Sequence, residues 1–321
     1  MQSTAVRAAL PAAAEVFRRQ AEARLRSVFA PHQGGVYDLA SYHLGFTDER
    51  GRPANGAGGK LLRPVLCLVT ASGYGDYQRA LDVAVALELL HAFSLVHDDI
   101  EDGDDQRRHR PTLWALHGVP LAINAGDSLF ALAHRVLGDA CEALTRDEAG
   151  AAMRTFSDAA LRMIEGQHRD LEFESRPSVT LAQYEAMAAG KTGALLGAAL
   201  ALGAICGGAS STDVDRLRDA GVQLGLAFQA VDDALAVWGD ASVTGKPAGN
   251  DVARGKKSLA VVLAAAAGAS AVGDPAVRGE IRRIAAEHAD RAREDISATT
   301  ISAAAAADLE ALASFVLHRE L

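Results

Sequence analysis

Residues 97–108 read HDDIEDGDDQRR and place six acids within eight positions, directly behind a mostly apolar run from Leu81 to Val96. Apolar runs of this kind, here and from Leu181 to Ala204, have the length of helices and lack the alternation that is typical of strands. They predict an all-α fold, a bundle whose interior these helices fill. The acids then stand at the end of a core helix.

The chain shows no change of composition that would mark a domain border. Weak breaks occur near residues 51–59, 207–212 and 244–255, and each has the length of a loop. A chain of 321 residues can bury a large core. A single domain over residues 1–321 is therefore expected.

The acidic segment predicts a cation site. On a helix, Asp98 and Asp102 are four positions apart and share one face, where their carboxylates repel each other. Hard oxygen ligands favour Mg²⁺, which leaves room for water and for the phosphates of a substrate. Arg107 and Arg108 follow at once and suit bidentate phosphate contacts. Together these residues indicate a diphosphate site.

A second acidic pair supports this interpretation. Asp232 and Asp233 interrupt an otherwise apolar stretch at 225–238, where burying an unpartnered carboxylate costs several kcal/mol. A segment with Gly and Pro follows and contains Lys246, and Lys256 stands further on. These lysines are expected to return toward the acids.

Five landmarks in this order resemble the trans-isoprenyl diphosphate synthases, the polyprenyl synthetase family. They are Gly58–Pro64, His91–Asp99, Lys191–Gly193, Phe228–Asp233 and Gly245–Pro247. With the pair Lys256–Lys257 they extend from about residue 58 to residue 258, which is most of the chain. The resemblance is strongest to a bacterial geranylgeranyl diphosphate synthase. It implies a helical bundle of the isoprenoid synthase type, with a central active-site cavity, and a homodimer.

The resemblance also implies the roles of individual residues. The expected Mg²⁺ ligands are Asp98, Asp102 and Asp232, supported by Asp99 and Asp233. The groups expected around an allylic diphosphate are Arg107, Lys191, Thr192, Gln229 and Lys246. Those expected around the diphosphate of isopentenyl diphosphate are Lys60, Arg63, His91 and Arg108. Lys256 is expected to close the site from the C-terminal side, and the residues expected to act in catalysis are Asp98, Asp99, Asp102, Arg107, Lys191 and Asp232.

The activity that the resemblance implies is a Mg²⁺-dependent prenyl transfer. Isopentenyl diphosphate is condensed head-to-tail with an allylic diphosphate. Three Mg²⁺ ions and several cationic side chains offset the charge on the departing diphosphate, so that the allylic C–O bond ionises. The released diphosphate accepts the final proton, and no catalytic histidine is expected. The resulting cation needs an apolar cavity from which water is excluded.

The product length is read from two residues on the helix before the acids. Phe93 stands five positions before Asp98, roughly 7.5 Å down a helix, where its ring would form the floor of the cavity. Ser94 beside it is small and adds no obstruction. This pattern, without an insertion in the acidic motif, resembles synthases that stop at twenty carbons. Geranylgeranyl diphosphate is the first choice, farnesyl diphosphate the second and longer chains the third.

Two positions depart from the family pattern. Ala236 stands where the second motif usually has a third aspartate, and Asp240 is the nearest later acid. His109 stands where the family often has glycine, an exchange that a loop tolerates unless φ is positive. Two other classes of protein stay open. A class I terpene cyclase would not need Lys60, Arg63 and His91, and a non-catalytic partner subunit of another synthase would explain Ala236.

Composition limits the partners and the compartment. A net charge of −9 argues against nucleic acid and against general attraction to anionic lipid. Cys67, Cys141 and Cys206 stand far apart in apolar surroundings, which favours reduced core residues and a cytoplasmic protein. The N-terminus lacks the apolar core of a secretory signal. The apolar stretch from Ala194 to Cys206 is too short for a bilayer, so no membrane span is expected.

Overall fold

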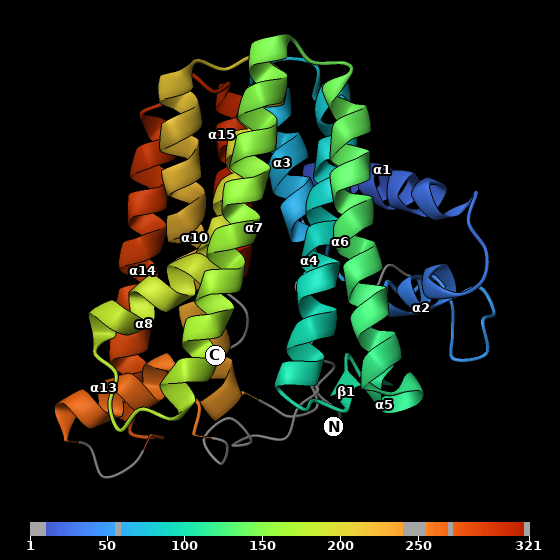
Figure 1. Ribbon diagram of the computed structural model, residues 1–321. Helices are drawn as coiled ribbons and strands as arrows, with labels where there is room; N and C mark the ends of the chain where they lie inside the picture. Colours follow the sequence, from blue (N-terminus) through green and yellow to red (C-terminus); the bar gives the residue numbers. More distant parts are fainter. Residues whose placement is uncertain (1–10, 55–58, 240–254, 269–271, 318–321) are drawn as a thin grey trace, which may run out of the picture.

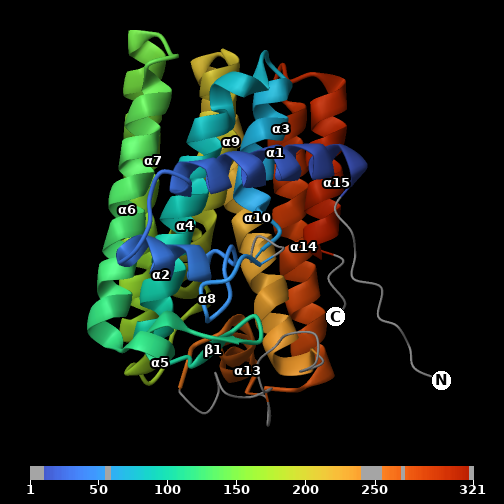
Figure 2. The same ribbon diagram turned by 90° about the vertical axis from the view of Figure 1, so that its right-hand side faces the viewer.

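The structure is a computed structural model that describes residues 11–54, 59–239, 255–268 and 272–317. Long helices run side by side along most of the molecule, while α1 crosses them near one end (Figures 1 and 2). The N-terminal and central elements are α1 Ala12–Phe29, α2 Val36–His43, α3 Leu62–Ser72, η1 Tyr77–Ala80, α4 Leu81–Glu101, β1 Gln106–Arg107, β2 Arg110–Pro111, α5 Leu113–His117 and α6 Val119–Cys141. The remaining elements are α7 Arg146–Glu174, α8 Leu181–Ala188, η2 Ala189–Gly193, α9 Ala194–Gly207, α10 Ser211–Trp238, α13 Leu259–Ala267, α14 Pro275–Ser297 and α15 Ala303–Leu317.

The apolar runs of the sequence form the centre of the bundle, and the predicted all-α class is confirmed. In α9, every residue from Ala194 to Cys206 is buried, and α4 is buried along most of its length. Helix α4 packs against α6 and α3, while α9 packs against α10, α3 and α7. A helix that is apolar all round belongs inside a bundle because each of its faces meets another helix.

Two segments, Tyr77–Glu101 and Leu181–Gly207, are long and apolar enough to cross a membrane by length and composition. The second exceeds the apolar stretch of the sequence because α8, η2 and α9 form one continuous helical segment. In the bundle, 67% and 89% of their apolar windows are buried. Burial in the protein core accounts for the apolar character of both segments. The three cysteines are free thiols, and Cys67 and Cys206 are buried as expected.

A short hairpin of β1 and β2 departs from the all-helical expectation. Arg107 pairs with Arg110, so Arg108 and His109 alone form the turn. Their φ angles are 53° and 61°. Two-residue hairpin turns with two positive φ angles match the twist of the strands and usually contain Asn or Gly. The condition under which His109 is costly is therefore met.

Replacing His109 with glycine is expected to stabilise the protein. A non-glycine residue in the left-handed region costs about 1–3 kcal/mol, and the added freedom of glycine in the unfolded chain offsets part of the gain. His109→Gly should raise the free energy of unfolding, measured by urea denaturation, by about 1 kcal/mol. Gly34→Ala is the matched control of opposite sign, since Gly34 has φ +80° and open space around it. A destabilised His109→Gly protein would contradict this account of the turn.

Candidate active site

Three helices carry acidic residues to the same end of the bundle. Helices α4, α7 and α10 all end near α8, α13 and the β1–β2 hairpin, in the lower part of Figure 1. Asp98 lies in the last turn of α4, Asp170 near the end of α7 and Asp233 near the end of α10. The acids that the sequence separates by more than 130 residues therefore approach one another in the fold.

Asp98 and Asp99 are paired with cations from two other elements. Arg107 of β1 places Nε 2.7 Å from Asp99 Oδ1 and Nη2 3.3 Å from Asp98 Oδ2, and Lys191 Nζ lies 3.2 Å from Asp98 Oδ1. Burial alone would raise the pKa of Asp98, but Lys191 and then Arg107 outweigh it and hold this pKa below its usual value. Burial raises the pKa of Asp99 to about 6 in spite of Arg107. Asp98 is therefore the more acidic carboxyl group of the pair.

Asp102 is held by the lysine that the sequence places behind the second acidic pair. Asp102 caps the C-terminus of α4, and only 7% of the residue is exposed. Its Oδ2 accepts a hydrogen bond of 2.7 Å from Lys256 Nζ. A contact across 154 positions of sequence thus brings Lys256 to the acidic site.

Lys191 bridges two helices from a distorted segment. It lies in the π-helix η2. Its Nζ donates a hydrogen bond of 2.6 Å to Asp170 Oδ2 and also lies 3.2 Å from Asp98 Oδ1. The segment packs directly on α7, where a Cβ on Gly166 would lie 2.1 Å from the backbone N of Lys191. Although burial favours the neutral amine, Asp98 and Asp170 hold the pKa of Lys191 above its usual value. Single π turns inside α-helices often occur at functional sites.

The two acids of the second pair, Asp232 and Asp233, have different surroundings. Asp233 is buried and accepts hydrogen bonds from Tyr184 Oη at 2.7 Å, Gln229 Nε2 at 2.8 Å and the backbone N of Leu259 at 2.6 Å. Its carboxylate thereby joins α8, α10 and the start of α13. Gln229 in turn accepts a 2.7 Å hydrogen bond from Thr192 Oγ1. Asp233, which was expected to support the metal, is committed to these contacts, while Asp232 is half-buried on the same helix.

The donor set of this site suits Mg²⁺. Asp98 and Asp102 offer hard carboxylate oxygens at one helix end, and the buried Asp98 Oδ1 is approached by Lys191 Nζ at 3.2 Å. Within the ranges that the structure describes, however, no three acidic, histidine or cysteine side chains converge closely enough to hold a metal ion. Lys191 and Lys256 place their ammonium groups on the carboxylates instead. A metal ion bound by these oxygens would have to displace the lysines.

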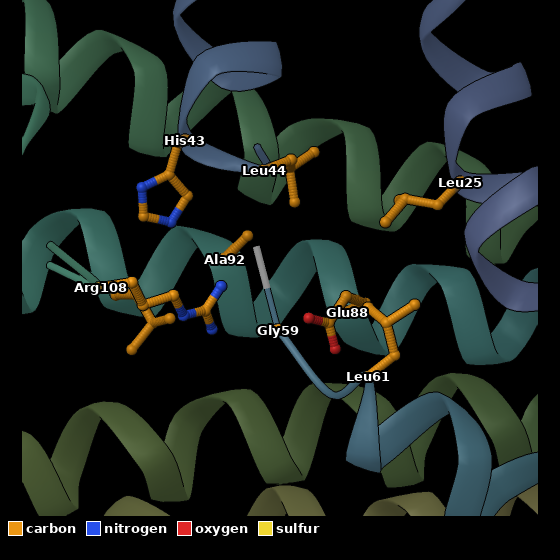
Figure 3. A pocket seen from close by; sticks show the side chains of 9 residues that line it. Leu25, His43, Leu44, Gly59, Leu61, Glu88, Ala92 and Arg108 are labelled. Carbon is orange, nitrogen blue, oxygen red and sulfur yellow. The ribbon is translucent and has the colours of Figure 1, made fainter. Parts of the chain in front are cut away.

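A separate pocket lies beside the hairpin. It takes up about 300 Å³, including space open to solvent, and Figure 3 shows its polar side chains. Its lining residues are Leu25, His43, Leu44, Gly59, Leu61, Glu88, Ala92, Leu95 and Arg108. The guanidinium of Arg108 lies so close to Gly59 that a Cβ there would be 2.8 Å from Nη2. A larger residue at position 59 would therefore displace the guanidinium from this place.

The residues expected to bind isopentenyl diphosphate differ in whether they reach this pocket. Burial, Arg63 and Arg108 lower the pKa of His91 well below its usual value, so these three groups are neighbours. Lys60 is exposed, and its Nζ lies 4.3 Å from the ring centre of Phe315 on α15. Of the four residues expected here, Arg108 lines the pocket, whereas Lys60, Arg63 and His91 do not. Lys246 falls outside the described residues, as does Gly58.

The two residues linked to product length face different surroundings. The ring of Phe93 is buried against α6, with its centre 5.0 Å from that of Phe130 and 4.8 Å from that of His97. Ser94 Oγ donates a hydrogen bond of 2.8 Å to the backbone O of His91, within its own helix. Phe93 therefore belongs to an aromatic layer between α4 and α6.

Three site residues were missed from sequence: Asp170, Tyr184 and His43. Asp170 stands in α7, whose many charges resemble a solvent-facing helix surface. Tyr184 and His43 stand in helices of only eight residues, where no motif or long apolar run marks them. The glycine at Gly166, four positions before Asp170 in an otherwise polar helix, is the one local signal that a second backbone approaches there.

Comparison with known proteins places these features in a family. Residues 52–298 match the family model described as polyprenyl synthetase. A (2E,6E)-farnesyl diphosphate synthase of Mycobacterium tuberculosis is 47% identical over 242 residues, which is 75% of this chain and 66% of that protein. A geranylgeranyl diphosphate synthase of the same organism is 44% identical over 230 residues, 70% of this chain and 64% of that protein. The chain thus spans slightly less than two thirds of the length of these relatives.

Solved structures agree with the sequence comparison. The crystal structure of a polyprenyl synthetase from Streptomyces coelicolor has a TM-score of 0.82 and 38% identity, and the match covers 95% of this chain and 98% of that one. The likeness therefore extends over nearly the whole chain. With the family model covering most of the chain, the conclusion is direct: this chain belongs to the polyprenyl synthetase family.

Proposed function

We propose that this protein is a Mg²⁺-dependent trans-prenyltransferase that condenses isopentenyl diphosphate with an allylic diphosphate. The observation that carries the proposal is the pair of neighbouring anion sites at one end of α4. One combines Asp98 and Asp102 with Lys191, Arg107 and Lys256, and the other combines Arg63, His91 and Arg108. A reaction between two diphosphates requires two such sites at a short distance.

The site residues suit ionisation of the allylic diphosphate. Mg²⁺, held by Asp98, Asp102 and Asp232, would supply positive charge to the leaving diphosphate. Lys191 and Lys256 would turn from the carboxylates to the phosphates when the carboxylates take up the metal. Asp170 keeps Lys191 close to the site during this exchange, because its 2.6 Å contact does not depend on Asp98. Arg107 remains anchored by Asp99.

The second site supports a synthase over a class I cyclase. A cyclase rearranges one diphosphate and has no use for a cationic pocket beside the metal site. Arg63 and Arg108 interact there with the buried Glu88. Burial raises the pKa of Glu88, and the positive charges of the two arginines act against this rise. Two arginines against one carboxylate leave the pocket positive, as an anionic second substrate requires.

For the product, geranylgeranyl diphosphate remains the first proposal and farnesyl diphosphate the alternative. The buried ring of Phe93 favours a stop at twenty carbons on the reasoning given above. The farnesyl assignment has its own support, since a relative of that name is 47% identical to this chain and one named for geranylgeranyl diphosphate is 44% identical. Incubation with Mg²⁺, isopentenyl diphosphate and each of the five-, ten- and fifteen-carbon primers, followed by product sizing, decides between them.

Removal of Arg63 is expected to separate the two substrates. Arg63→Ala should raise KM for isopentenyl diphosphate at least tenfold, because a hydrogen bond to a charged group contributes about 1.5–3 kcal/mol. KM for the allylic primer should change less than threefold. Arg52→Ala is the matched control, since Arg52 pairs with Asp48 in an exposed loop. Equal increases of both KM values would show that Arg63 does not belong to the isopentenyl pocket.

We further propose that the protein is a homodimer joined through α6 and α7. The structure exposes large apolar side chains there, including Ile123 (40%), Leu161 (60%) and Ile164 (45%). Burying the exposed half of such a side chain between two copies contributes about 1 kcal/mol per residue, since full burial contributes about 1.5–3 kcal/mol. A monomer has no partner for this surface.

A single substitution that adds a negative charge to this surface tests the dimer. Leu161→Glu should weaken the dimer at least tenfold, because each interface would bury an unpaired carboxylate. The measurement is the dimer dissociation constant by mass photometry. Val16→Glu, at an exposed valine on α1, is the control and should leave it unchanged. A wild-type protein that stays monomeric at micromolar concentration would refute the dimer, and an unaffected Leu161→Glu dimer would move the interface to another face.

A further inference from the structure

The pocket beside the hairpin contains a polar residue to which the proposed function gives no role. His43 ends α2 and lines the pocket together with Arg108, Gly59 and Glu88. Figure 3 shows His43 and Arg108 on one side of the pocket and Glu88 with Leu61 on the other. The imidazole and the guanidinium therefore border the same space, and the guanidinium also interacts with the carboxylate of Glu88.

The end of α2 is fastened to the hairpin that carries Arg108. Tyr42 Oη donates 2.8 Å to the backbone O of Pro111, and the guanidinium of Arg110 lies 4.1 Å from the ring centre of Tyr42. Arg110 Nη2 also donates 2.9 Å to the backbone O of Thr47, beyond the end of α2. His43, directly after Tyr42, is thus held at a fixed position relative to Arg108.

The charges around His43 indicate an anionic ligand. Burial, followed by the positive charges of Arg107, Arg108 and Arg110, lowers the pKa of His43 to about 3. The imidazole is therefore neutral near pH 7 and has one N–H to donate. Among the described residues, none makes a hydrogen bond to this imidazole. A phosphate oxygen that binds the arginines would meet a ready donor there.

We propose that His43 is a binding residue for the diphosphate of isopentenyl diphosphate, donating one imidazole N–H to a phosphate oxygen beside the guanidinium of Arg108. This inference rests on the proposed function and extends the set of binding residues to α2. It assigns His43 no part in the chemistry of the allylic substrate. The effect of its removal should therefore be confined to one substrate.

Two substitutions separate the N–H from the volume of the ring. His43→Phe keeps an aromatic ring without a donor, and it should raise KM for isopentenyl diphosphate about tenfold or more. His43→Gln keeps a donor, and its KM should stay within about threefold of the wild-type value. For both variants, kcat and KM for the allylic primer should stay within about twofold. His32→Phe is the matched control, because the His32 ring stacks on Tyr37 at 4.2 Å outside the pocket.

A binding measurement separates this inference from the proposed function. Titration calorimetry with isopentenyl diphosphate in EDTA removes the metal on which the allylic site depends. His43→Phe should weaken this binding by the same factor as KM, and His43→Gln should not. If the wild-type protein binds isopentenyl diphosphate but forms no product, the proposed function fails and the role of His43 stands.

The remaining outcomes overturn the inference. Wild-type affinity in His43→Phe would show that the imidazole makes no contact with the diphosphate. Equal losses in His43→Phe and His43→Gln, or equal losses for both substrates, would show a packing role. If His43→Phe does not fold, the wild-type protein with ¹⁵N-labelled histidine gives the answer. Its His43 N–H signal, assigned by its loss in His43→Gln, should shift on saturation with isopentenyl diphosphate, and an unmoved signal refutes the contact.

Discussion

Asp98→Ala is expected to lower kcat about a thousandfold or more and to leave the fold intact. Metal-borne positive charge on the leaving group contributes several kcal/mol to the transition state, and each 1.36 kcal/mol corresponds to a factor of ten. The cations around Asp98 keep other partners, since Lys191 still contacts Asp170 and Arg107 still contacts Asp99. The thermal midpoint should therefore change little. Initial rates at saturating substrates and a melting curve check both parts.

The choice of Asp98 over Asp102 follows from the ion pairs. Asp102 is almost fully buried and holds Lys256, so Asp102→Ala would leave the ammonium of Lys256 buried without this carboxylate and lower stability as well. Glu101→Gln is the matched control in the same motif, because the exposed Glu101 accepts a hydrogen bond from Gln167. Its kcat should stay within about threefold. Near-wild-type turnover by Asp98→Ala would remove Asp98 from the metal site.

Phe93→Ala is expected to lengthen the product beyond twenty carbons. The buried ring packs between α4 and α6, and on the proposal that it forms the floor of the product cavity, its removal leaves room for a longer prenyl tail. Each added isoprene unit then buries apolar surface at about 25 cal/mol per Å², so sterics alone oppose elongation. Stability should fall by about 3 kcal/mol or more, as for other buried Phe→Ala changes. Product sizing by reversed-phase chromatography measures the effect.

A graded pair of variants controls for the loss of stability. Phe93→Leu should give a mixture of lengths, while Phe156→Leu removes the same volume from a fully buried ring on α7. Phe156 is the far member of the ring contacts that run from Phe93 through Phe130 and His134. Its variant should lose stability without a change of product. Unchanged length in an active Phe93→Ala enzyme would show that Phe130 or a deeper residue forms the floor.

The helices that bear the acids could be predicted because their composition is extreme. The apolar character of α4 and of the stretch of α10 around Asp232 favours burial, and carboxylates at Asp98 and Asp232 conflict with it unless they serve a cation. The polar helix α7 carries no such conflict, and Asp170 therefore could not be distinguished from its exposed neighbours. Its role depends on η2, whose π turn arises from packing rather than from a periodic pattern.

The pockets depend on contacts between distant segments and on unusual backbone angles. Lys60, in a landmark segment, lies over Phe315, more than 250 positions away, which no local pattern indicates. Arg108 reaches Gly59 because two successive residues of the hairpin turn adopt positive φ. Such turn positions usually contain Asn or Gly. The turn at Arg108 and His109 therefore could not be predicted from its residues and follows only from the tertiary structure. His43 reaches the pocket for the same reason, through the attachment of α2 to the hairpin.

The most direct test of the account is the condensation itself. Purified protein is mixed with radiolabelled isopentenyl diphosphate, farnesyl diphosphate and Mg²⁺, with matched reactions that contain EDTA or the Asp98→Ala protein. The account predicts that label enters an acid-labile prenyl diphosphate of twenty carbons in the complete mixture, and that both matched reactions stay at background. Consumption of farnesyl diphosphate without incorporation of label would identify a cyclase, and no conversion of farnesyl diphosphate would contradict the account.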